Sequence, residues 1–207
     1  MVTAAIMCGG KGSRMQGFAN IEKPLLKLRG KTMVELVVDT LLQSRNFSKI
    51  VAATSSNTPN TKSHLLSNLS HKVDILQTEG ISYSNDIFSV LNALKPDTVF
   101  VVTADLPLLT LKEVNQIVLD WKRQNPCTCV MSEKRFVTDI GINPSITVRI
   151  DSRQYCYSGI SVIDSSKARR GAKIDESYLI MNQIGVAVNV NTRSDFEIAE
   201  MLMSSRI

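Results

Sequence analysis

The chain has 207 residues, of which 43% are apolar, and its formal net charge is +5. This length and apolar content suit a single domain over residues 1–207, because no linker rich in Pro, Gly or Ser divides the chain. The mild positive charge favours anionic substrates, although an ordinary solvated surface carries such a charge equally well. The basic residues show no helix-turn-helix or zinc-finger spacing, so nucleic-acid binding has no support.

The four cysteines and the apolar runs indicate in which cellular compartment the protein acts. Cys127 and Cys129 lack the two-residue gap of a metal knuckle or redox motif, and we expect all four thiols to be reduced and mostly buried. The longest apolar runs fall far short of the ~20 residues that a membrane helix needs. The N-terminus starts directly with a strand pattern and shows no charged leader with a cleavage site. These features predict a cytoplasmic protein with no membrane partner.

Short β-branched runs alternate with segments of helical spacing along the chain. The expected strands are Val2 to Met7, Lys49 to Ala53, Val73 to Leu76, Val99 to Thr103, Thr128 to Met131 and Val186 to Val190. The expected helices carry their apolar residues over Met33 to Leu42, Ile87 to Leu94, Val114 to Trp121 and Phe196 to Leu202. This alternation predicts an α/β fold: a mostly parallel, Rossmann-like sheet with right-handed crossovers, covered on both faces as a three-layer α/β/α sandwich.

Residues 133–153 break this rhythm and show few periodic signals. We interpret this segment as a small inserted flap on the acceptor side of the site, within the same domain. The flap and the apolar last helix are also surfaces through which a homodimer could form.

In an open parallel sheet, ligands bind at the carboxyl ends of the strands, and the first loop at that edge runs from Cys8 to Met15. Its glycines allow close approach of the backbone, its N–H groups can point at an anion, and Lys11 and Arg14 supply positive charge. The spacing does not match the P-loop, since Lys11 lies between two glycines. It does not match G-x-G-x-x-G either, since Met15 takes the place of the last glycine. The loop therefore predicts a nucleotide site of another kind.

Arg14 and Lys23 are the strongest candidates for catalysis. Attack of a phosphate oxygen on an α-phosphorus builds negative charge on the equatorial oxygens and on the departing pyrophosphate, and fixed cations stabilise that charge without proton transfer. Arg14 can bind two oxygens at once, whereas Lys23, beside the stiff Pro24, acts as a point charge. The alternative for Lys23 is a solvated surface lysine.

Asp105 and Asn191 are the candidate metal ligands. Asp105 ends a buried run, and its carboxylate could bind Mg²⁺, which takes one or two carboxylates plus substrate oxygens. Asn191 follows the last expected strand and could complete the metal shell. Structural alternatives stay open: a turn cap for Asp105, a turn residue for Asn191, and a capping role for the neighbouring Thr192 and Asp195.

Two further loops could contact the base. Residues 55–59 could hydrogen-bond a base edge or cap the helix that follows, and both interpretations stay open. Glu79 could accept hydrogen bonds from the ring N–H and the exocyclic amine of guanine. We expect Asp86 to cap a helix or face solvent, and His64 and His71 to lie on the surface.

Four motifs together resemble the nucleotidyltransferases of the GT-A-like superfamily, to which the MobA-like enzymes belong. The motifs are Gly9 to Met15, Glu22 to Leu25, Ala104 to Pro107 and Asn189 to Thr192. Within the superfamily, the chain is most similar to the archaeal adenosylcobinamide-phosphate guanylyltransferases of cobamide synthesis. That likeness rests on the short length and on Lys23 to Leu28, Ala53 to Lys62 and Asn191 to Leu202.

The resemblance implies transfer of GMP from GTP to a phosphorylated corrinoid, adenosylcobinamide phosphate, which yields adenosylcobinamide-GDP and pyrophosphate. It implies that the glycine loop, Lys23 and the 54–58 loop hold GTP, and that Asp105 serves the metal. Together with the reasoning from the residues, this gives Arg14 and Lys23 as the predicted catalytic residues and Mg²⁺ as the cofactor, with Asp105 and Asn191 as its ligands. The predicted nucleotide-binding residues are Met7, Cys8, Gly9, Gly10, Lys11, Gly12, Ser13, Arg14, Lys23, Thr54, Ser55, Asn57, Glu79, Gly80 and Asp105.

Three alternatives stay open. Molybdenum-cofactor guanylyltransferases share the glycine loop and the Asp105 region, but they usually have Gly-Asp-Lys where this chain has Glu22 before Lys23. Sugar-1-phosphate nucleotidyltransferases share the G-x-G-x-R loop but normally carry more sequence. A nucleotide-binding regulator that lost turnover is the third class. Loss of Arg14, Lys23 or Asp105 would indicate such a regulator, and all three are present.

Overall fold

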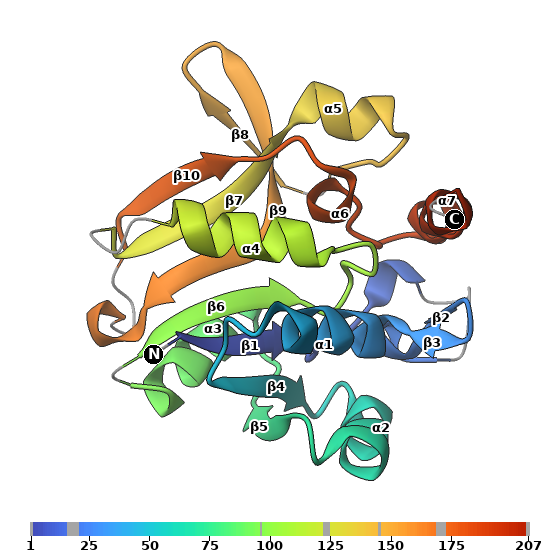
Figure 1. Ribbon diagram of the computed structural model, residues 1–207, viewed down its shortest axis with the longest axis vertical. Helices are drawn as coiled ribbons and strands as arrows, with labels where there is room; N and C mark the ends of the chain where they lie inside the picture. The colour runs from blue at the N-terminus through green and yellow to red at the C-terminus, as the bar shows by residue number, and fades with distance from the viewer. Residues whose placement is uncertain are drawn as a thin grey trace.

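A computed structural model describes residues 2–15, 21–95, 97–121, 125–144, 146–168 and 173–205. In this part of the chain, eight strands form one mixed sheet in the order β10-β7-β9-β6-β1-β4-β5, with β8 paired to β9 (Figure 1). The strands are β1 (Val2–Met7), β4 (Lys49–Ser55), β5 (Asp74–Thr78), β6 (Thr98–Thr103), β7 (Cys127–Glu133), β8 (Thr147–Ile150), β9 (Arg153–Asp164) and β10 (Glu176–Ile180). A separate two-stranded ribbon joins β2 (Lys27–Leu28) to β3 (Lys31–Thr32).

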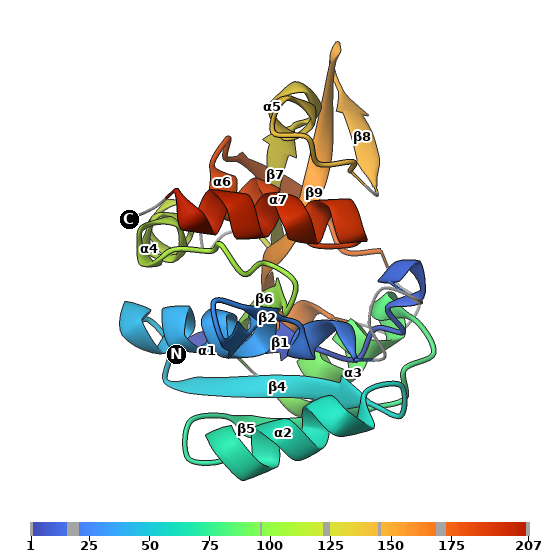
Figure 2. The ribbon, with the colours of Figure 1, turned by 90° about the vertical axis from the view of Figure 1, so that its right-hand side faces the viewer.

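Helices cover both faces of this sheet, as the alternating pattern predicts. They are α1 (Met33–Ser44), α2 (Pro59–Leu69), α3 (Tyr83–Ala93), α4 (Leu111–Asp120), α5 (Lys134–Asp139), α6 (Ile184–Ala187) and α7 (Arg193–Ser204). Helices α1, α2 and α4 pack on strand residues such as Ile6 and Phe100, whereas α3 packs on the alternate residues such as Met7 and Val101. Helix α7 lies beside these layers, near α6 (Figures 1 and 2). Among the described residues, no helix has both the length and the apolar content needed to cross a bilayer.

The parallel core of the sheet creates the edge at which the site lies. Strand β1 pairs in parallel with both β4 and β6, so the carboxyl ends of these three strands meet. Their side chains are buried on both faces, which explains why they read as continuous apolar runs in the sequence. The loops that follow Met7, Ser55 and Thr103 therefore converge at one place.

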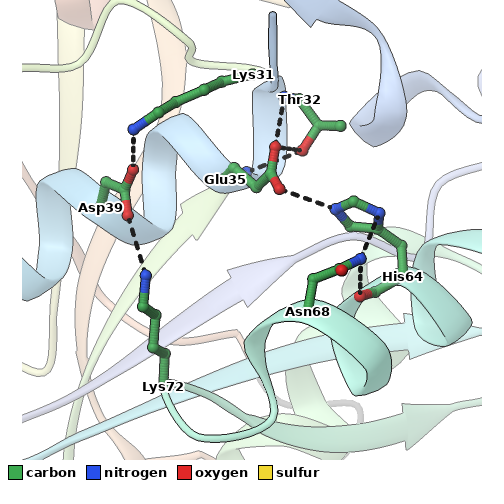
Figure 3. A network of polar contacts seen from close by, with 7 residues as sticks. All are labelled: Lys31, Thr32, Glu35, Asp39, His64, Asn68 and Lys72. Carbon is green, nitrogen blue, oxygen red and sulfur yellow. Dashed lines mark hydrogen bonds and ion pairs between the residues drawn. The ribbon is translucent and has the colours of Figure 1, made fainter.

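A polar network fixes α2 against α1 (Figure 3). Glu35 completes a capping box at the start of α1 by accepting from the N–H and the hydroxyl of Thr32, at 2.7 and 2.8 Å. Its second oxygen lies 3.2 Å from Nε2 of His64 on α2. Lys31 and Lys72 both contact the carboxylate of Asp39, at 2.6 and 3.8 Å. His64 was expected on the surface, and its side chain is only partly exposed.

Two expectations about the sheet need correction. The expected strand Val186 to Val190 is wrong: the chain there forms the short helix α6 and then an extended segment outside the sheet. The alternating valines are buried instead against other elements, and α6 starts where the N–H of Gly185 donates to Glu113 Oε1 at 2.9 Å. Strand β9 was not expected, yet it runs antiparallel between β6 and β7.

Residues 133–153 form a projection at one end of the sheet, visible at the top of Figure 1. The segment contains α5 and β8, and β8 pairs antiparallel with the first part of β9. Residues 137, 142–144 and 146 line the larger of the two cavities described below. That this segment acts as an acceptor-side flap stays a prediction.

Candidate active site

Two cavities meet at the carboxyl edge of the sheet. The smaller, of about 370 Å³, is lined by the glycine loop, by Lys23 and by the start of α3. The larger, of about 780 Å³, is lined by α3, β7, β9 and the projecting segment. Tyr83, Thr103 and Asp105 line both. Ligands in the two cavities would therefore meet beside Asp105.

Hydrogen bonds tie the glycine loop to the end of β4, and part of the loop is exposed to the smaller cavity. The carbonyl of Gly9 accepts from Ser55 Oγ at 2.8 Å and from Asn57 Nδ2 at 3.5 Å, which ties the loop to the end of β4. Gly10 and Lys11 are exposed and line the smaller cavity. The loop can thus offer its backbone and one cation to an anionic ligand.

Gly80, in the loop after β5, also lines the smaller cavity. Its φ is +71°, and a Cβ there would lie 2.5 Å from Asn57 Nδ2 and 2.7 Å from Ser55 Oγ, so only glycine fits. Its carbonyl accepts from Asn57 Nδ2 at 2.9 Å, and its N–H donates to Asp86 Oδ1 at 3.0 Å. Ser55 and Asn57 therefore join the loops after β1, β4 and β5 into one frame.

Asp105 lies at the centre of a cluster that unites the predicted catalytic and metal-binding residues. Lys23 forms an ion pair with Asp105 Oδ2, and its Nζ also donates to Asn191 Oδ1 at 3.2 Å. Arg14 Nη2 donates to the same Asn191 oxygen at 3.0 Å. Four residues from separate loops, the outermost 177 positions apart in the sequence, thus meet at one point.

The segment that replaces the expected last strand orients Asn191. Asn191 Nδ2 donates to Asn189 Oδ1 at 2.5 Å. The Oδ1 atom of Asn191 is thereby turned toward Arg14 and Lys23. The N–H of Asn191 donates to Asp195 Oδ2 at 2.9 Å, within the capping box of α7. The N–H of Val190 donates to the carbonyl of Asp105 at 2.9 Å. These bonds hold Asn191 beside Asp105.

The oxygens of Asp105 and Asn191 suit Mg²⁺, which prefers carboxylate and amide oxygens. Asp105 is 8% exposed, and its Oδ1 is buried without a hydrogen-bond partner in the described part of the chain. A buried oxygen of this kind calls for a donor or a cation. No group of three or more His, Cys, Asp or Glu side chains among the described residues could hold a metal. Further ligands would therefore come from substrate phosphates and water, as is usual for Mg²⁺.

Asp86 is the residue that sequence reasoning failed to place in the site. It was expected to cap a helix or face solvent, but it is 6% exposed and lines the smaller cavity. Its Oδ1 accepts from Gly80, whereas its Oδ2 has no partner among the residues described. Its position in the first turn of α3 was an available signal, because side chains there point back toward the helix N-terminus and hence the sheet edge.

The structure brings most of the predicted nucleotide-binding residues to the smaller cavity. Those that line it are Met7, Cys8, Gly9, Gly10, Lys11, Lys23, Asn57, Gly80 and Asp105. Arg14 lines the larger cavity. The linings do not include Gly12, Ser13, Thr54, Ser55 and Glu79. Thr54 is fully buried and Glu79 is exposed, so direct contact of these five with nucleotide stays a prediction.

Two acidic groups at the junction remain protonated. Burial, and secondly the charge of Asp105, raise the pKa of the Cys8 thiol. Desolvation and then Asp105 likewise raise the pKa of the Tyr83 hydroxyl, with a smaller effect from Cys129. The protonated hydroxyl of Tyr83 offers a hydrogen-bond donor between the cavities.

The larger cavity has a mainly apolar wall. Its apolar residues include Ile87, Phe88, Leu91, Val137, Ile142, Ile146, Ile160, Ile163, Ile174 and Val186. Cys127, Cys129 and Cys156 also line it, and all four cysteines of the chain are free and buried, as the sequence predicts. A ligand with a large apolar surface and a phosphate at the Asp105 end would match this wall.

Comparisons with known proteins show the family and the fold. Residues 4–170 match the model of the MobA-like NTP transferase domain. The chain is 32% identical to an adenosylcobinamide-phosphate guanylyltransferase of Methanocaldococcus jannaschii, over 97% of this chain and 96% of the relative. It is 30% identical to a probable molybdenum cofactor guanylyltransferase of Thermococcus sibiricus, over 60% and 58% of the two chains. A solved nucleotidyl transferase of Methanothermobacter shares the fold, with a TM-score of 0.70 at 14% identity over 100% of this chain and 99% of that one.

Proposed function

This chain belongs to the MobA-like NTP transferase family and is a nucleotidyltransferase, and we propose that it transfers GMP from GTP to adenosylcobinamide phosphate. The proposal is carried by the position of Arg14, Lys23, Asp105 and Asn191, at the junction of the smaller cavity and the larger, mainly apolar one. The name of the Methanocaldococcus relative, which matches nearly the whole chain, supports the choice of donor and acceptor.

In the proposed reaction, a phosphate oxygen of the acceptor forms a bond to the α-phosphorus of GTP. The bond between that phosphorus and the oxygen of the pyrophosphate leaving group breaks, and pyrophosphate carries the electron pair away. Negative charge grows on the equatorial oxygens and on the leaving group. Arg14 and Lys23 stabilise this charge as fixed cations, and no side chain has to transfer a proton.

We propose Mg²⁺ as the cofactor, with Asp105 and Asn191 as its protein ligands. Bound there, the ion would neutralise phosphate charge and polarise the phosphoryl oxygens. Lys23 contacts the same two side chains, at Asp105 Oδ2 and Asn191 Oδ1. Nucleotide phosphates would attract Lys23 away from Asp105, so that the metal and the nucleotide bind together.

We assign base recognition to Asp86 in place of Glu79, because only Asp86 lines the nucleotide cavity. Its carboxylate would repel phosphates, so it belongs at the base end of the nucleotide, whereas Lys11 and Lys23 belong at the phosphate end. The free Oδ2 can accept from the N–H groups on the edge of guanine. Adenine and the pyrimidine bases of CTP and UTP do not offer the same pair of adjacent donors.

The apolar wall of the larger cavity favours a corrinoid over a sugar phosphate. A sugar presents many hydroxyls, which need polar partners when they are desolvated, whereas most of the surface that lines this cavity is apolar. A corrinoid presents a large ring surface that such a wall can cover. A molybdenum-cofactor acceptor is the second candidate, because the Thermococcus relative bears that name over 60% of this chain.

Equilibrium binding tests the donor and the acceptor separately. With Mg²⁺ present, we expect calorimetry to show GTP binding at least ~10-fold more tightly than ATP, CTP or UTP. To protein saturated with a non-hydrolysable GTP analogue, adenosylcobinamide phosphate should bind more tightly than adenosylcobinamide. Equal affinities for the four nucleotides would contradict the guanine assignment. Absence of corrinoid binding would contradict the acceptor.

Two further predictions concern the setting of the enzyme. Four free thiols are compatible with the reducing cytoplasm, where we propose that the protein acts. A homodimer through the projecting segment or α7 is also proposed, and size-exclusion chromatography with light scattering would test it.

A further inference from the structure

The carboxylate of Glu22 caps a helix that lies far away in the sequence. Its Oε1 accepts from the N–H of Asn60 at 2.8 Å, and its Oε2 accepts from the N–H and the hydroxyl of Thr61, both at 2.6 Å. The N-cap residue of α2, Thr58, makes no side-chain capping bond of its own. Glu22 therefore supplies hydrogen-bond acceptors to N–H groups in the first turn of α2, although it lies 38 positions before Asn60 in the sequence.

This cap anchors the turn that carries Lys23. The N–H of Leu25 donates to the carbonyl of Glu22 at 2.8 Å, and the N–H of Leu26 donates to that of Lys23 at 3.2 Å. Pro24 is buried inside this tight turn and fixes its own φ. The turn is thus held to α2 at Glu22, while the side chain of Lys23 extends the other way.

Lys23 reaches its partners from this anchored turn. Its Nζ contacts Asp105 and Asn191, at the end of β6 and before α7. A lysine side chain has four rotatable bonds, and its point charge acts on a transition state only when the ammonium is held near the reacting atoms. The carboxylate of Glu22 also occupies the positive end of α2, so this helix terminus is satisfied by the protein itself.

We infer that Glu22 is a positioning residue for nucleotidyl transfer, which places Lys23 opposite Asp105 by anchoring its turn to α2. The inference rests on the proposed role of Lys23. It concerns a residue that lines neither cavity, and it gives the acidic residue before the lysine a positioning role.

Single-turnover kinetics in two backgrounds tests this inference. Glu22→Ala should lower the rate of transfer about 10- to 100-fold with little change in GTP affinity, because the lysine is displaced. Glu22→Asp keeps the charge and should restore part of the rate. In protein that already carries Lys23→Ala, adding Glu22→Ala should change the rate by less than about twofold, because Glu22 acts through Lys23. A wild-type rate for Glu22→Ala, or the same loss in both backgrounds, would overturn the inference.

Stability and the position of Lys23 provide readouts that do not need turnover. A purely structural cap would lower Tm in both backgrounds and leave the rate of the folded enzyme unchanged. In NMR spectra of ¹³C-methylated lysines, Glu22→Ala should move the Lys23 resonance, assigned with Lys23→Arg, toward those of exposed lysines. Glu200→Ala, at an exposed position on α7, is the charge-matched control.

These readouts separate the two claims. An unchanged Lys23 resonance in Glu22→Ala would overturn the role of Glu22 even without an active acceptor. If wild type were inactive with every acceptor while Glu22→Ala still moved the Lys23 resonance, the proposed function would be contradicted, but the placement of Lys23 by Glu22 would stay supported.

Discussion

At the scale of single residues, Lys23 and the proposed metal share the same two side chains. Lys23 contacts Asp105 Oδ2 and Asn191 Oδ1, and its positive charge would oppose a cation bound there. We predict that Lys23→Met, which keeps the length of the side chain and removes its charge, will bind Mn²⁺ at least about tenfold more tightly than wild type without nucleotide. Electron paramagnetic resonance of free Mn²⁺ measures this directly.

The control for that experiment is Asp105. Adding Asp105→Asn to Lys23→Met should remove the gain, because the carboxylate is the stronger of the two proposed ligands. If Lys23→Met and wild type bound Mn²⁺ equally, the ion would not use these oxygens.

Asp86 gives a second prediction at this scale. In Asp86→Asn, the side-chain oxygen can still accept from Gly80, but the other position presents an N–H₂ group to the base. We expect GTP affinity to fall about 10- to 100-fold while ATP affinity stays within about threefold, since guanine then meets donor against donor. Fluorescence titration with both nucleotides measures the ratio. Equal losses for GTP and ATP would indicate that Asp86 serves only the frame around Gly80.

At the scale of elements, burial on both faces made the central strands easy to predict. Strands β1, β4 and β6 read as continuous apolar runs, and their predicted and observed bounds agree within two residues. Strand β9 has alternating burial and carries polar residues and Gly159, so it showed no apolar run. The valines from Val186 to Val190 alternate like a strand, but Glu113 caps α6 there through a contact between distant parts of the chain.

The residues of the candidate site also fall into those that the sequence could predict and those that it could not. The glycine loop, Lys23 and Asp105 carry local motifs, and the structure brings them together as predicted. Asp86 and the Glu22 cap have no local signature, because each depends on a partner from another loop.

The capping box of α1 gives an element-scale prediction about pH. Burial alone would raise the pKa of Glu35, but hydrogen bonds from Thr32 and the interaction with His64 outweigh it and lower that pKa overall. A lowered pKa means that the charged form stabilises the fold at neutral pH and that this contribution is lost as the pH falls through the lowered pKa. We predict that Glu35→Gln costs about 0.5–1 kcal/mol of unfolding free energy at pH 7.

Urea unfolding of wild type and Glu35→Gln checks this prediction across pH. The difference between the two proteins should shrink as the pH is lowered from neutral to below the pKa of Glu35. Glu200→Gln, at an exposed site on α7, is the charge-matched control and should show no comparable loss. A difference that is constant with pH, or that grows in acid, would contradict the role of the Glu35 charge.

At the scale of the whole molecule, the fold separates the two halves of the proposed reaction. The parallel part of the sheet, β1, β4, β5 and β6, carries the loops of the smaller cavity. The antiparallel part, with β7, β9 and the projecting segment, forms the apolar cavity. Asp105 ends the strand that separates them, so donor and acceptor can approach one cluster of charges from opposite sides.

The most direct test of this account is pyrophosphate release with Mg²⁺, in which GTP, ATP, CTP and UTP are each paired with adenosylcobinamide phosphate, molybdopterin and sugar 1-phosphates. We predict turnover with GTP and adenosylcobinamide phosphate alone. Turnover with GTP and another acceptor would keep the chemistry and contradict the assignment of the apolar cavity. Tight GTP binding without pyrophosphate release from any pair would contradict the central claim that this cluster catalyses nucleotidyl transfer.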